Sequence, residues 1–100
     1  MDKYAAYVKF TAKAGERDKL TNILMEAANA AQTVKECELY LINLSEKEPD
    51  AVWVTEVWSS ADAHKASLDQ PETRDSIARA MPLIAGVEAI PLNLLGGKGL

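Results

Sequence analysis

Residues 52–68 read VWVTEVWSSADAHKASL, and this stretch decides the fold. A run of β-branched and aromatic residues ends at a serine pair, and a short helical pattern begins directly after it. Ser60 is placed to cap that helix, and Asp62 in the first turn complements the helix dipole. The stretch also carries Glu56, both tryptophans of the chain and its only histidine, so we expect the chemistry of the protein to be concentrated here.

The segments before this stretch predict a strand, a helix and a second strand. Residues 3–10 alternate in the manner of a half-buried strand, and apolar residues recur at helical spacing over 20–34. Residues 37–44 are again rich in β-forming side chains. A loop at 45–51 joins them to the β-rich run 52–58, so we expect these two runs to form a hairpin.

The segments after it predict a split helix and a last strand. The helix that follows Ser60 is short because Pro71 interrupts it, and Pro71 suits the first position of a further helix, which Pro82 kinks or ends. Residues 87–95 form the last strand, and Pro91 within them indicates an edge position or a bulge, because proline cannot donate to the ladder. The apolar stripe of the later helix consists of Ile77, Met81 and Ile84.

This order of elements predicts the α+β class, as a ferredoxin-like βαββαβ fold with a split second helix, in a single domain over residues 1–100. Helices cover one face of such a sheet, yet both faces of the predicted strands are apolar, with Trp58 on one side and Trp53 on the other. A large exposed apolar patch marks an interface. We therefore expect a homodimer in which two sheets pack as an α/β barrel, with residues 96–100 as a mobile tail or a strap across the partner.

The composition predicts a soluble cytoplasmic protein. A net charge of -4 argues against nucleic-acid and anionic-membrane partners. The chain shows no signal peptide and no apolar run long enough to span a membrane. A lone cysteine, Cys37, cannot form an internal disulfide, which suits a reducing cytosol. One cysteine and one histidine are too few for a zinc site, so no metal is expected.

Glu56 and His64 are the candidate catalytic residues. Glu56 lies mid-strand on an apolar face, and burial there would suit a proton acceptor or donor. The alternative is a carboxylate held by a backbone amide, a lysine or an arginine. His64 shares a helical stripe with Ala61 and Leu68, so it faces inward, where an imidazole suits general base catalysis. A core histidine that caps a carbonyl is the alternative.

Aromatic and sulfur-containing side chains are candidates to line a flat, apolar pocket beside these two residues, suited to a small aromatic ligand. Individually, each is an ordinary core or interface residue. No Ser/His/Asp, Cys/His or paired-carboxylate motif is present, so motifs alone leave enzyme and binding module both open. The candidate substrate-binding residues are Trp58, Tyr4, Tyr40 and Met81.

Residues 53–72, WVTEVWSSADAHKASLDQPE, resemble the antibiotic biosynthesis monooxygenase family. In that family a strand ending in Glu-x-Trp leads through a serine into an Ala-His helix and then into a proline-started helix. The opening KFTAKAGERDKL (9–20) and the ending from PLIAG (82–86) to LLGGKGL (94–100) resemble a bacterial subgroup called quinol monooxygenases. The resemblance covers essentially all of the chain and implies a dimeric α/β barrel.

The resemblance also implies that a quinol or phenol is oxidised by molecular oxygen without metal, flavin or another cofactor. The pocket would take a proton from the substrate hydroxyl, and the electron-rich anion would pass an electron to oxygen. By resemblance, His64 is the base, Glu56 its orienter or a second proton acceptor, and Trp58 with Tyr4 the packing surface. Many relatives carry a histidine at the position of Ser67, so a role carried by that histidine does not transfer.

Other activities of similar proteins remain as alternatives. Haem-degrading relatives are expected to have a tryptophan, a haem-ligating histidine and an asparagine where this chain has Ser67, Ile77 and Lys9. Iron needs an axial ligand, which Ile77 cannot provide, so haem degradation is the weaker interpretation. Isomerases of small phosphorylated diones need a polar phosphate clamp, which the apolar strand faces fit less well. A dimeric barrel that binds a small molecule without turnover also stays open.

Overall fold

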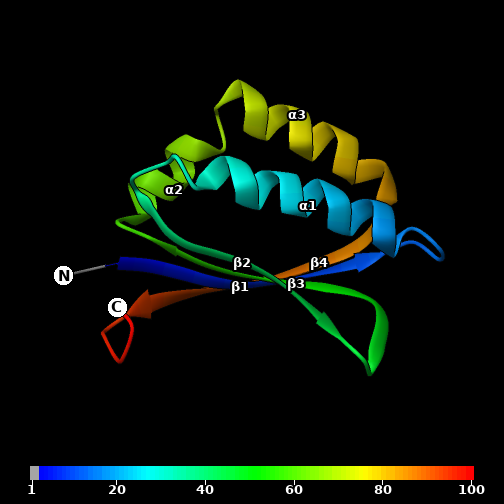
Figure 1. Cartoon of the computed structure of the whole chain (residues 1–100), viewed down its shortest axis with the longest axis horizontal. Coiled ribbons are helices and arrows are strands. Elements are labelled where there is room, and N and C mark those ends of the chain that lie inside the picture. The colour runs from blue at the N-terminus through cyan, green and yellow to red at the C-terminus, as the bar shows by residue number, and fades with distance from the viewer. Residues whose placement is uncertain (1–2) are drawn as a thin grey trace.

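A computed structural model describes residues 3–100 and shows an antiparallel sheet with the helices on one face (Figure 1). The sheet has four strands in the order β2-β3-β1-β4. This topology, together with the split helix, confirms the predicted ferredoxin-like fold of the α+β class. The elements are β1 (Lys3–Ala12), α1 (Arg17–Ala31), β2 (Cys37–Ser45), β3 (Glu48–Trp58), α2 (Ala61–Ser67), α3 (Pro71–Ala80), the 3-10 turn η1 (Met81–Leu83) and β4 (Ile84–Leu94).

The hairpin loop is shorter than predicted. Strand β3 begins at Glu48, so the connection is a tight turn at Glu46 and Lys47 instead of the whole of 45–51. Proline is tolerated at position 49 because the pairing of β3 with β1 reaches only to Ala51, so β1 needs no donor from Pro49.

The assignment of Ile84 to a helix was also wrong. Helix α3 ends at Ala80, the short turn η1 contains Pro82, and Ile84 opens β4 by pairing with Ala12. Proline lacks the amide donor that a continuing helix requires, so the chain turns there into the sheet. Pro91 lies in β4, and β4 is an edge strand, as the sequence predicted.

The core lies between α1 and the helix-covered face of the sheet. Leu20 of α1 and Val52 of β3 have 0% exposure, and Val54 has 1%. Helix α1 turns its apolar side toward the sheet because Leu20 and Leu24 lie one turn apart on the same face. Ala6 and Val8 of the central strand β1 complete the contact, so the two central strands are fixed beneath the helix.

The other face of the sheet carries large apolar side chains that are open to solvent. Tyr7 of β1, Leu41 of β2 and Ile90 of β4 are 50%, 48% and 51% exposed. Along each strand, these residues and their pairing partners alternate with the core residues. They therefore point to the face of the sheet that the helices do not cover. Beside them, the Lys9 ammonium lies 5.6 Å from the ring centre of Trp53. Both sheet faces are therefore apolar, as predicted.

Replacing Leu20 by alanine should destabilise the protein by about 2–5 kcal/mol, because a fully buried side chain is lost and a cavity remains. The matched control is Met25→Ala on the same helix, where the side chain is 45% exposed and the expected loss is below about 1 kcal/mol. Urea unfolding followed by circular dichroism measures both. Equal losses for the two variants would contradict this description of the core.

Candidate active site

Four of the sequence-predicted site residues meet at one end of the helix-covered face. Glu56 and Trp58 are two residues apart on β3 and so point to the same side. Tyr4 of β1 pairs with Trp58, and Tyr40 of β2 pairs with Glu56. Side chains paired in this way lie on the same face, with Cβ atoms about 4.5–5.5 Å apart.

The Glu56 carboxylate is buried, with 8% of the residue exposed. Its Oε1 atom accepts a hydrogen bond of 2.9 Å from the Trp58 indole Nε1. The His64 Nε2 atom lies 3.7 Å from the same oxygen, which makes it the nearest cationic partner when the imidazole is protonated. Among the ion pairs of residues 3–100, no lysine or arginine pairs with Glu56.

The cap of α2 places His64. Ser60 Oγ accepts a hydrogen bond of 3.0 Å from the Ala63 amide, as the sequence predicted, so α2 starts immediately after β3. The His64 ring stacks on Tyr4, with centroids 4.6 Å apart and 24° between the planes. It also meets the edge of Trp58 at 5.6 Å. The imidazole thus faces inward, between two aromatic rings and a carboxylate.

Burial and the Glu56 charge raise the pKa values of the neighbouring phenols and thiol. Burial raises the pKa of Tyr40 above its usual value, and the Glu56 carboxylate raises it further. The pKa of Tyr4 is raised by the same two causes in the same order. Burial, followed by the charge of Glu56, also raises the pKa of Cys37. At neutral pH these groups are therefore protonated hydrogen-bond donors.

The structure does not bring Met81 to this group. Met81 is 60% exposed in η1, just before the point where Ile84 pairs with Ala12. Tyr4 lies at the other end of β1, about 26 Å from Ala12 at the usual rise per residue of a strand. Helical spacing grouped Met81 with other apolar residues but carried no information about which end of the sheet it would occupy.

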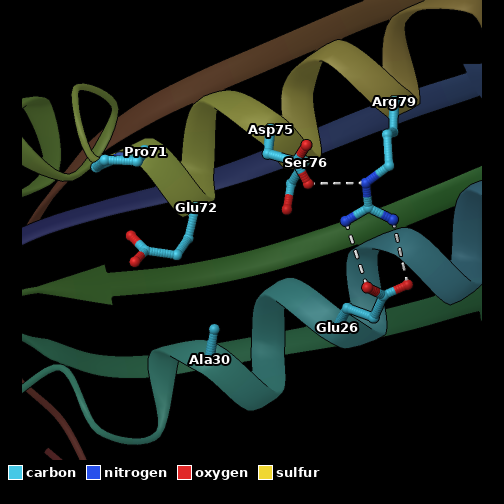
Figure 2. A pocket seen from close by; sticks show the side chains of 7 residues that line it. All are labelled: Glu26, Ala30, Pro71, Glu72, Asp75, Ser76 and Arg79. Atoms are coloured by element: carbon cyan, nitrogen blue, oxygen red, sulfur yellow. Dashed lines mark hydrogen bonds and ion pairs between the residues drawn. The ribbon is translucent and has the colours of Figure 1, made fainter.

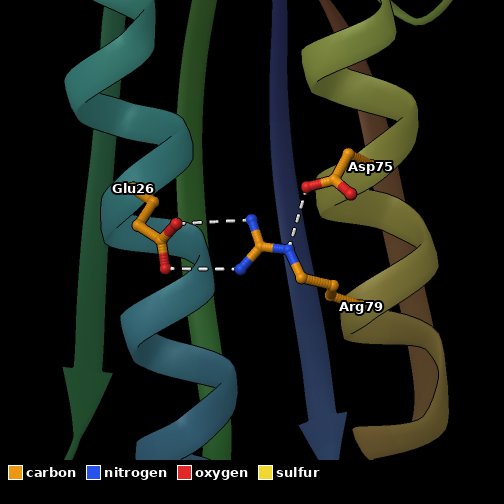
Figure 3. Close-up of polar contacts among 3 residues, drawn as sticks. All are labelled: Glu26, Asp75 and Arg79. Carbon is orange, nitrogen blue, oxygen red and sulfur yellow. Dashed lines mark hydrogen bonds and ion pairs between the residues drawn. The ribbon is translucent and has the colours of Figure 1, made fainter.

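A large hollow of about 410 Å³ lies elsewhere, between the outer sides of α1 and α3 (Figure 2). Arg79 bridges it, with guanidinium nitrogens 3.3 and 3.4 Å from the two carboxylate oxygens of Glu26 and 3.0 Å from Asp75 (Figure 3). The carboxylates engage every nitrogen of the guanidinium fork, so this cation connects the two helices.

Two further features concern residues 3–100. No group of three or more histidine, cysteine, aspartate or glutamate side chains is arranged to hold a metal ion. Nor does this part of the chain contain a helix with the length and apolar character needed to cross a membrane.

Tyr40 should make stability fall at alkaline pH. Because its pKa is raised in the folded state, the unfolded chain releases the phenol proton first, from about pH 10. The stability that the buried Tyr40 phenol contributes is fully present below that pH and is lost as the pH rises toward the folded-state pKa. Urea unfolding between pH 8 and pH 11 should therefore show a steeper loss for the parent than for Tyr40→Phe, and parallel curves would contradict the burial of this phenol.

Comparisons with known proteins agree with this fold. The profile of the antibiotic biosynthesis monooxygenase family matches residues 3–79. A candidate antibiotic biosynthesis monooxygenase from Chloroflexus aurantiacus is 41% identical, with 97% of each chain covered and a TM-score of 0.87. No curated protein matches the chain.

More distant solved structures share the fold alone. A candidate antibiotic biosynthesis monooxygenase from Deinococcus radiodurans is 19% identical over 97% of each chain, with a TM-score of 0.85. One from Caulobacter crescentus is 16% identical, with 95% of this chain and 92% of that chain covered and a TM-score of 0.89. Because the family profile matches residues 3–79, which are most of the chain, this chain belongs to the antibiotic biosynthesis monooxygenase family.

Proposed function

We propose that this protein is a cofactor-independent monooxygenase that oxidises a small quinol or phenol with molecular oxygen. The observation that carries the proposal is the contact of the His64 imidazole with the buried Glu56 carboxylate beside Tyr4 and Trp58. An inward base beside flat aromatic surfaces is what deprotonation of an aromatic hydroxyl requires. The membership of the chain in a monooxygenase family supports the same reaction class.

The reaction needs no external reductant. Loss of the hydroxyl proton to His64 makes the ring electron-rich, so that it can transfer an electron to oxygen. One oxygen atom then enters the ring as a carbonyl and the other leaves as water, with all four electrons supplied by the substrate. Glu56 stabilises the imidazolium that forms, because its Oε1 atom lies 3.7 Å from His64 Nε2 and opposite charges attract strongly at that distance in a buried site.

The aromatic side chains hold the substrate in this proposal. Trp58, with 5% of the residue exposed, excludes water from Glu56 and fixes its carboxylate by the indole hydrogen bond. Tyr4, stacked on His64, offers a flat surface and a protonated hydroxyl. Ser67 donates its hydroxyl to the His64 carbonyl at 2.6 Å, so it supports the helix and takes no direct part in proton transfer.

We also propose that the protein is a cytoplasmic homodimer. The open sheet face, with Tyr7, Leu41 and Ile90 half exposed, is the surface that a second sheet would cover. Leu95, 96% exposed at the start of the C-terminal segment, supports a strap onto the partner over residues 96–100. Cys37 is a free thiol, which suits a reducing compartment.

Oxygen uptake with a panel of quinols and naphthols tests the oxygenase. We expect oxygen-dependent turnover that His64→Ala lowers by on the order of 100-fold or more, the usual contribution of a general base. Trp58→Phe should also lower kcat, since it removes the indole donor to Glu56. Lys65→Ala, on the same helix, is the control and should match the parent.

Other outcomes would replace the proposal. Absence of oxygen uptake above background, or a fully active His64→Ala variant, would rule out the assigned site. Conversion that proceeds equally well without oxygen would identify an isomerase of a small dione. Ligand binding without any product would identify a binding barrel, and a Soret band that His64→Ala abolishes would indicate haem.

Light scattering tests the dimer. We expect a mass twice the 10.9 kDa of the chain at micromolar concentration, and a shift toward the monomer mass in Ile90→Glu, which places a charge on the open face. Leu44→Glu is the matched control, because Leu44 is 52% exposed but lies on the helix-covered side. A parent protein that runs at the monomer mass would contradict the proposed interface.

A further inference from the structure

A second groove, of about 310 Å³, lies between the C-terminal half of α1 and the start of the edge strand β2. It is distinct from the hollow that Arg79 bridges. Two alanines of α1 leave room above the strand, because their side chains extend no further than a methyl group. The groove is lined by Ala28 and Ala31 of α1, by Gln32 directly after it, and by Cys37, Glu38, Leu39 and Tyr40 of β2.

Tyr40 links this groove to the site. It lines the groove, and in strand register it pairs with Glu56 on the helix-covered face. Cys37, also in the groove, pairs in the same way with Trp58. The two groove residues therefore lie on β2 directly beside the two site residues on β3. A ligand in the groove would approach Glu56 from the β2 edge, on the opposite flank from Tyr4 on β1.

The charges around the groove select against anions. Glu38 lines the groove with its carboxylate paired with Lys3 at 2.6 Å, and the Glu56 charge acts on Tyr40 from the neighbouring strand. The other polar groups that line it are neutral: the Tyr40 phenol, the Cys37 thiol and the Gln32 amide. The raised pKa values of Tyr40 and Cys37 keep both protonated at neutral pH, so both can donate to a ligand oxygen.

The size suits a small ligand. A volume of about 310 Å³ is at the lower end of the range for small-molecule sites, roughly 300–1,000 Å³. The alanine methyl groups and the Tyr40 ring are apolar surfaces, and the hydroxyl supplies one oriented hydrogen bond. This combination fits an uncharged aromatic alcohol or ketone better than an acid or a sugar.

We infer that the groove between α1 and β2 is a binding site for a small neutral aromatic molecule, and that Tyr40 donates a hydrogen bond to its oxygen. The inference rests on the proposed function, because it names the side from which the aromatic substrate of the same Glu56 site enters. It adds a specificity: neutral rings bind, and their carboxylated counterparts are excluded by the charge of Glu56, since Lys3 offsets that of Glu38.

Titration with 2-naphthol and 2-naphthoate at pH 7, followed by calorimetry, tests this directly. We expect 2-naphthol to bind at least tenfold more tightly than 2-naphthoate. Ala31→Phe fills the groove and should raise the Kd for 2-naphthol at least tenfold. Ala30→Phe is the matched control: its neighbouring position on α1 lines the other hollow, so its Kd should stay within twofold of the parent.

Two further measurements keep the test decisive if Ala31→Phe fails to fold. Tyr40→Phe removes only the hydroxyl and should weaken 2-naphthol binding by roughly three- to tenfold, the usual worth of one hydrogen bond. Amide chemical shifts of the parent should change at Ala31, Cys37 and Tyr40 on addition of 2-naphthol. Shift changes confined to other surfaces, or no binding at millimolar 2-naphthol, would overturn the inference.

The outcomes separate the groove from the proposed reaction. Naphthol binding that Ala31→Phe abolishes, without oxygen uptake by any quinol, would leave the groove in place and remove the oxygenase. Oxygen-dependent turnover with an unchanged KM in Ala31→Phe would leave the oxygenase in place and overturn the groove as its entrance.

Discussion

A buried carboxylate with one strong neutral donor is the constraint on which the rest of the site depends. Moving an ionised carboxyl group out of water costs several kcal/mol unless hydrogen bonds or an opposite charge offset the loss. Glu56 receives one bond, 2.9 Å from the Trp58 indole, and stands 3.7 Å from the imidazole of His64. Protonation of His64 would supply the missing charge. In the proposed reaction, this charged imidazolium is the state that His64 reaches when it has taken the substrate proton.

The architecture serves this pair at the end of β3. Ser59 donates its amide to the Glu36 carbonyl at 2.8 Å, which ties the end of β3 to the segment before β2. Ser60 then caps α2 immediately, so only a short connection separates Trp58 from His64. Because the connection is short and hydrogen-bonded, the imidazole has little freedom to leave the carboxylate. The fold thus joins a sheet position, Glu56 in β3, to a helix position eight residues later, His64 in α2.

Local pattern was enough to predict the fold and the faces of the key side chains. A period of two placed Glu56 with Trp58, and helical spacing placed His64 inward, because both depend on nearby residues alone. The indole bond to Glu56 and the distance from Met81 to the site could not be predicted, since they depend on rotamers and on strand register across the sheet. The groove beside Tyr40 escaped prediction for the same reason: alanines on α1 and a tyrosine on β2 become neighbours only through tertiary packing.

The indole proton of Trp58 reports most directly on the central contact. In a nitrogen-proton correlation spectrum, this account predicts that the Trp58 indole signal exchanges with solvent more slowly than the Trp53 signal, because the Trp58 indole is buried and bonded to Glu56. Glu56→Gln should move it upfield and leave the Trp53 signal in place. A Trp58 indole that exchanges as fast as that of Trp53 and does not respond to Glu56→Gln would contradict the account.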